Sequence, residues 1–151
     1  MKRILTFCIA AFLISCEGLA PLDDVDPEGI IAVTITYEGD WPSSNELFDL
    51  RFLAFRFIPQ NESDFTRITE MVVSDRLQYN VDEQTIVIRN IRNGTFFYNA
   101  IGWQFGPDIF SNWRPAGEYR ENDGIAVLRG DSIHLDIHVD FDNLPAFPPE
   151  F

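Results

Sequence analysis

The stretch SIHLDIHVDF, residues 132–141, decides the fold. Five apolar side chains occupy every second position: Ile133, Leu135, Ile137, Val139 and Phe141. Four titratable side chains fill the positions between them: His134, Asp136, His138 and Asp140. Successive side chains of a strand point to opposite faces, so this alternation predicts a strand with one buried face. A slip by one residue would bury the titratable groups, so its pairing register is strongly specified.

Similar β-rich segments recur along the chain between turn-forming residues. The predicted strands cover residues 30–37, 50–58, 85–91, 95–104, 125–128 and 132–141, with weaker candidates at 66–68 and 70–73. Asn93-Gly94 predicts a tight hairpin between 85–91 and 95–104. About seven short strands separated by turns favour one all-β domain, a single antiparallel β-sandwich.

The segment IVIRNIRNGTFFYNA, residues 86–100, carries a resemblance. It resembles the strand, turn and "Gly-Thr-Tyr" strand of transthyretin-like and carboxypeptidase-regulatory-like domains. Residues 30–142 also resemble Bacteroidota lipoproteins that contain such domains. The resemblance implies a transthyretin-like or Ig-like sandwich, and a fold alone assigns no function.

The first sixteen residues have the layout of a signal peptide. Lys2 and Arg3 precede an apolar run over residues 4–14 and then Cys16. The run is shorter than the roughly 20 residues that a membrane-spanning helix needs. LISC, residues 13–16, resembles the bacterial lipobox, which implies cleavage before Cys16 and acylation of that cysteine. An ordinary secretory signal that contains a cysteine is the alternative.

These features predict four segments. Residues 1–15 are predicted to form a lipoprotein signal peptide. Residues 16–29 contain the lipidated Cys16 and an acidic tether interrupted by proline. Residues 30–142 form the β-sandwich, and residues 143–151 form a proline-rich tail. The other cysteine, Cys8, lies inside the signal peptide, so the mature chain has no internal disulfide. We therefore expect an outer-membrane lipoprotein of a bacterial cell envelope, on the periplasmic face or the cell surface.

Net charge limits the partners. The chain has 24 acidic and 11 basic residues, and nine of the basic residues, all arginines, follow residue 16. Nucleic acid is therefore excluded as a partner, because binding to phosphates needs a basic face. The expected partners are a membrane, through the N-terminal lipid, and a glycan or another envelope protein. The domain itself is expected to be monomeric.

The polar face of residues 132–141 is a candidate metal site. His134 and His138 lie roughly 13 Å apart on an extended strand, so one small ion cannot bind both unaided. Asp136 and either histidine are close enough to bind zinc together if a neighbouring strand adds a ligand. The alternative is a solvated polar face opposite a core face, and we expect no resident cofactor.

Aromatic residues cluster in WQFGPDIFSNWRPAGEY, residues 103–119. A loop broken by glycine and proline that carries Trp103, Phe110, Trp113 and Tyr119 could offer flat faces to sugar rings. The alternative is that these rings pack over an open end of the domain.

No catalytic motif stands out: the sequence has no Gly-x-Ser-x-Gly elbow and no glycine-rich phosphate loop, and a catalytic carboxylate pair among the 24 acidic residues would leave no sequence pattern. The resulting hypothesis is a non-enzymatic, membrane-anchored binding or interaction module. The alternatives are a carbohydrate-binding accessory or hydrolase that uses unidentified carboxylates, and a structural subunit of a surface assembly.

Overall fold

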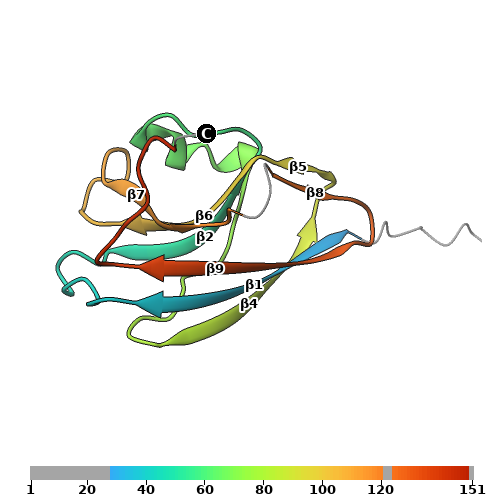
Figure 1. Ribbon diagram of the computed structural model, residues 1–151. Coiled ribbons are helices and arrows are strands. Elements are labelled where there is room, and N and C mark those ends of the chain that lie inside the picture. The colour runs from blue at the N-terminus through green and yellow to red at the C-terminus, as the bar shows by residue number, and fades with distance from the viewer. Residues whose placement is uncertain (1–27, 121–123, 150–151) are drawn as a thin grey trace, which may run out of the picture.

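The computed structural model describes residues 28–120 and 124–149, and their fold is all-β (Figure 1). The signal peptide, Cys16 and nearly all of the predicted tether lie outside the described residues. The strands are β1 (Gly29–Glu38), β2 (Asp49–Phe55), β3 (Met71–Val73), β4 (Glu83–Ile91), β5 (Gly94–Phe96), β6 (Tyr98–Gln104), β7 (Trp113–Glu118), β8 (Ile125–Val127) and β9 (Ser132–Asp140). Two 3₁₀ helices, η1 (Glu62–Thr66) and η2 (Ile68–Glu70), precede β3.

The alternating stretch forms β9, as predicted. Leu135, Ile137 and Val139 are buried, and the polar positions between them face solvent. β9 pairs in parallel with β1 over nine residue pairs, from Ile30↔Ser132 to Glu38↔Asp140. The two strands thus present their buried side chains to one core. Each such side chain contributes about 1.5–3 kcal/mol of gross hydrophobic stabilisation.

Seven strands form one continuous sheet in the order β3-β2-β6-β7-β9-β1-β4, and β5 and β8 form a separate pair. The sheet is strongly curled: Val72 of β3 and Ile86 and Ile88 of β4, from its two edges, pack against the same core cluster. In Figure 1, β2 and β6 lie above β9, β1 and β4. The all-β prediction is confirmed. The antiparallel two-sheet sandwich is not what forms, because the parallel β1–β9 ladder joins the strands into one mixed sheet.

The predicted hairpin at Asn93-Gly94 is wrong. β4 pairs with β1, β5 pairs with β8, and β6 lies between β2 and β7. Residues 95–104 are therefore divided between two strands rather than forming one. The weak strand candidate at 66–68 is also wrong, since this region belongs to the two 3₁₀ helices.

A second, smaller core covers the outer face of β2, β6 and β7. Phe65 of η1 contacts Phe55 edge-on and stacks with Trp113, at centroid distances of 5.4 and 6.1 Å. Phe147 packs edge-on against Phe65 at 5.5 Å. The segment predicted as a proline-rich tail is therefore packed against the domain as far as the structure describes it. Among the described residues, no helix has the length and apolar character needed to cross a bilayer.

Candidate functional site

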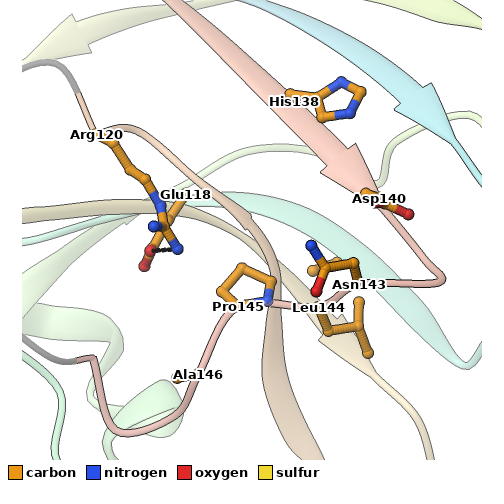
Figure 2. A pocket seen from close by; sticks show the side chains of 9 residues that line it. Glu118, Arg120, His138, Asp140, Asn143, Leu144, Pro145 and Ala146 are labelled. Atoms are coloured by element: carbon orange, nitrogen blue, oxygen red, sulfur yellow. Dashed lines mark ion pairs between the residues drawn. The ribbon is translucent and has the colours of Figure 1, made fainter.

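A pocket of about 500 Å3 lies between β7, β9 and the C-terminal segment (Figure 2). Glu118 and Arg120 line it at the end of β7, and His138 and Asp140 line it from β9. Ala116 and residues 143–146, Asn143, Leu144, Pro145 and Ala146, complete the lining. The pocket is thus formed by the outer surface of the sheet and a segment that crosses over it.

The pocket exists because β7 and β9 separate from each other. Their only registered pair in the described sheet is Gly117↔Val139. A Cβ atom added at Gly117 would lie 2.5 Å from the carbonyl oxygen of His138, closer than real Cβ contacts. Glycine therefore allows the strands to touch at this one point, and the space beside it remains open.

Glu118 is fixed by two partners. Tyr98 donates its hydroxyl to Oε2 over 3.1 Å, and Nη2 of Arg120 forms an ion pair with Oε1 (Figure 2). Burial raises the pKa of Tyr98, and the charge of Glu118 and the hydrogen bond to it raise that pKa further. Tyr98 therefore stays neutral and serves as a donor, whereas the Arg120 side chain is 73% exposed and can reach a ligand.

The β9 side chains are held by different neighbours. Asp140 accepts a hydrogen bond from the amide of Asp142 over 3.0 Å, which sets the turn into the C-terminal segment. Nδ1 of His138 lies 3.0 Å from the hydroxyl of Thr36, and its Nε2 lies 3.3 Å from a carboxylate oxygen of Glu38. His138 is thus oriented toward β1, at the rim of the pocket.

The predicted metal residues do not converge on one point. Nε2 of His134 lies 3.1 Å from Asp136 and 3.3 Å from the hydroxyl of Thr34. His138 instead contacts Thr36 and Glu38 on β1. Within residues 28–120 and 124–149, no group of three or more His, Cys, Asp or Glu side chains is arranged to hold a metal ion. The side chains of His134, Asp136 and His138 are largely exposed on the outer face of β9, and a metal site there stays a prediction.

The four predicted aromatic residues do not form one platform. Trp103 packs against the main core and donates its indole N–H to the carbonyl of Glu46 over 2.7 Å. Trp113 is buried in the second core, on the other face of the sheet. Tyr119 is partly buried against the main core, whereas Phe110 is 62% exposed. Two of the rings thus serve as core residues on opposite faces of the sheet.

Phe110 lies at the tip of a loop that is ordered by its own hydrogen bonds. Asp108 accepts from the amide of Phe110 over 2.8 Å and from the hydroxyl of Ser111 over 2.7 Å. The hydroxyl of Ser111 and then the amide of Phe110 lower the pKa of Asp108. Neighbouring Ile109 is 53% exposed, so this tip is apolar but contributes nothing to the pocket lining.

Sequence reasoning found only His138 among the pocket residues. It missed β7 because Pro115 and Gly117 both argue against a strand. Pro115 is accommodated at a register shift, where Ile101 pairs with Gly117 and Gly102 pairs with Pro115. No local pattern marks residues 143–146 as a pocket wall, since their position depends on packing by Leu144 and Phe147.

Comparison with protein-family models, with curated proteins and with solved structures found no match. The chemistry of the site therefore has to be argued from its own residues. They supply acceptors in Glu118 and Asp140, donors in Arg120 and Asn143, and a small apolar surface beside them.

Proposed function

We propose that the protein is a non-catalytic binding module, held at a bacterial cell envelope by a lipid on Cys16, whose ligand site is the pocket between β7, β9 and residues 143–146. The observation that carries this proposal is the pocket itself: carboxylates on β7 and β9 and the guanidinium of Arg120, just after β7, line one cavity. Binding sites are often built in this way, from polar groups and loops positioned by a fixed scaffold. The lipid anchor is supported by the sequence of residues 1–16.

The lining favours a small ligand with several hydroxyl groups, such as a short glycan. Carboxylates of Glu118 and Asp140 can accept hydrogen bonds from hydroxyls, and the Arg120 guanidinium can donate several in a fixed fork. Leu144 and Pro145 add an apolar surface for the carbon face of a sugar ring. The acidic character of the whole chain disfavours a strongly anionic ligand.

Binding is favoured over hydrolysis because both carboxylates already have partners. Glu118 is engaged by Tyr98 and Arg120, and Asp140 by the amide of Asp142. A general acid or base must be able to exchange a proton with the substrate, and a nucleophile must be able to reach it. Carboxylates held in this way are better suited to orienting hydroxyl groups.

A glycan-array screen of the mature protein tests this proposal. For a glycan that binds, we expect Arg120→Ala to reduce affinity about tenfold or more, because a charge-assisted donor contributes roughly 1.5–3 kcal/mol. Arg129→Ala is the matched control, since Arg129 lies in the loop between β8 and β9 and does not line the pocket; it should leave affinity unchanged.

Two results would contradict the proposal. Release of a shortened glycan during incubation would show turnover and would favour the hydrolase alternative, with Glu118 and Asp140 as its carboxylates. Binding that survives Arg120→Ala but is lost in Phe110→Ala would place the ligand on the loop of residues 105–112 instead.

A further inference from the structure

A groove separates the two edges of the curled sheet. β3 and β4 lie at opposite ends of the strand order, and each pairs on one side only. Two adjoining cavities of about 400 and 540 Å3 lie between them. One has residues 73–76 on one side and 86–89 on the other, and the second has residues 71–73 opposite 88–93. The groove thus follows both edges over most of their length.

The β3 edge presents free backbone groups to this groove. The carbonyl of Glu70 and the amide of Ser74 both hydrogen-bond to β2, over 3.0 Å each. Hydrogen-bonded positions alternate along an antiparallel ladder. Met71 and Val73 therefore turn their amides and carbonyls away from β2, toward the groove.

The β4 edge does the same over a longer distance. The amide of Tyr37 donates to the carbonyl of Asp82 over 2.9 Å, which fixes the alternation along the β1–β4 ladder. Counting along the register, the backbone groups of Thr85 and Val87 point away from β1; beyond Ile88 the register shifts at a bulge. An edge of this length is a template for pairing with another strand. Val87 is 50% exposed in the part of the chain that the structure describes.

Side-chain hydrogen bonds tie the two sides of the groove together at both ends: Gln84 to Gln78 at one end, and Arg56 to the carbonyls of Arg92 and Asn93 at the other. The side chain of Gln84 accepts from the amide of Gln78 and donates to its carbonyl, over 3.0 Å in each case. This clamp closes the connection between β3 and β4. At the opposite end, the groove reaches Arg92 and Asn93. An extended segment would therefore lie along the groove between these two ends.

The groove is basic although the chain is acidic. Four arginines line it, Arg56, Arg76, Arg89 and Arg92, against a single acid, Asp75. After residue 16 the chain has only nine arginines and 24 acidic residues. Nearly half of the arginines are therefore gathered along one groove, which favours an acidic occupant.

Two of these arginines have fixed positions. Arg56 donates to the carbonyls of Arg92 and Asn93 over 3.0 and 3.2 Å, and its guanidinium lies 4.7 Å from the ring centroid of Phe96. A Cβ atom at Gly94 would lie 1.7 Å from Nη1 of Arg56, so this glycine leaves room for the guanidinium. Arg76 pairs with Asp49 over 3.1 Å. Arg89 and Arg92 are exposed at the groove and supply its accessible positive charge.

We propose that this groove binds an acidic, extended peptide segment of a partner protein, which adds to the β4 edge as an antiparallel strand. Backbone hydrogen bonds to Thr85 and Val87 provide affinity, as in other cases of strand addition. Alternate side chains of the segment contact the apolar groups at the core side and the arginines at the outer side. This surface is separate from the pocket at β7 and β9, and the inference does not depend on the ligand of that pocket.

The probe is an end-capped eight-residue peptide in which glutamate alternates with valine, titrated into the mature protein by calorimetry. We expect saturable binding that weakens with added salt. The matched peptide with lysine in place of glutamate should not bind. On addition of the glutamate peptide, the amides of Thr85 and Val87 should become protected from hydrogen exchange.

Variants assign the binding to the groove. The double variant Arg89→Glu/Arg92→Glu should lose about tenfold or more in affinity, whereas Arg89→Lys/Arg92→Lys, which keeps both charges, should lose little. Val87→Pro removes one edge amide without removing a β1 hydrogen bond, and it should weaken binding while the fold is retained.

Several results would overturn the inference. Equal binding of both peptides, or binding unaffected by the glutamate variants, would show that neither charge nor this groove is responsible. Binding that appears only after deletion of residues 17–28 would assign the groove to the chain's own acidic segment. Concentration-dependent dimerisation that excludes the peptide would assign it to a second copy. If the glycan-array screen finds no ligand for the pocket, the interpretation of the peptide titration does not change.

Discussion

Phe52→Ala should lower the free energy of unfolding by about 3–5 kcal/mol, the usual cost of removing a buried aromatic side chain. Phe52 is fully buried in the main core, on β2. The curled sheet encloses this core from both sides, so neighbouring strands cannot close the cavity without shifting the whole sheet. Urea unfolding of the mature protein, followed by circular dichroism, measures the difference.

Phe110→Ala is the matched control for this substitution. Its ring is 62% exposed at the loop tip, so we expect a change within about 0.5 kcal/mol, as for most surface positions. A loss at Phe110 as large as that at Phe52 would contradict the described packing. A negligible change in the free energy of unfolding for Phe52→Ala would contradict it as well.

Cys16→Ser should abolish stable membrane attachment. Each buried acyl methylene contributes about 0.8 kcal/mol, and several chains together hold a protein firmly whereas one holds it only marginally. Serine offers no thiol for the thioether, so the acyl chains of the predicted anchor cannot be attached at this position. Membrane fractionation followed by mass spectrometry of the N-terminal peptide should therefore find a diacylated or triacylated Cys16 in the natural sequence and none in the variant.

Cys8→Ser is the control for this experiment. Cys8 lies within the apolar run of the predicted signal peptide, so this variant should be acylated and attached as usual. An unmodified N-terminus at another residue would reject the lipid anchor. Attachment of the Cys16→Ser variant equal to that of the natural sequence would reject it as well.

Local patterning was enough to predict the strands that face one core. The alternation in residues 132–141 became β9, and the β-branched run at residues 30–37 became β1. In both strands the buried face is set by side-chain spacing alone, which a sequence displays directly. The acidic tether and the lipidated cysteine lie outside the described residues and stay predictions.

Strand partners could not be predicted in the same way, because pairing is decided by distant segments. Asn93-Gly94 has the composition of a tight turn, but Arg56 binds the carbonyls of residues 92 and 93 and β6 pairs with β2 instead of β4. The parallel β1–β9 ladder joins segments about 100 residues apart. Neither arrangement leaves a signal within a short window of sequence.

The candidate site was largely hidden for the same reason. The pocket depends on a strand that contains Pro115, on the separation of β7 from β9, and on a C-terminal segment held by its own packing. The aromatic cluster attracted attention because tryptophans at a broken loop are typical of sugar-binding surfaces. Trp103 and Trp113 instead fill two cores on opposite faces of the sheet.

The pocket and the groove both require one curled, mixed sheet in which β1 and β9 run in parallel. Backbone nuclear Overhauser effects in isotope-labelled protein test this arrangement most directly. The structure predicts contacts that advance in the same direction along both strands, through Val33–Leu135, Ile35–Ile137 and Tyr37–Val139. Contacts that run in opposite directions along the two strands, as in an antiparallel sandwich, would contradict it.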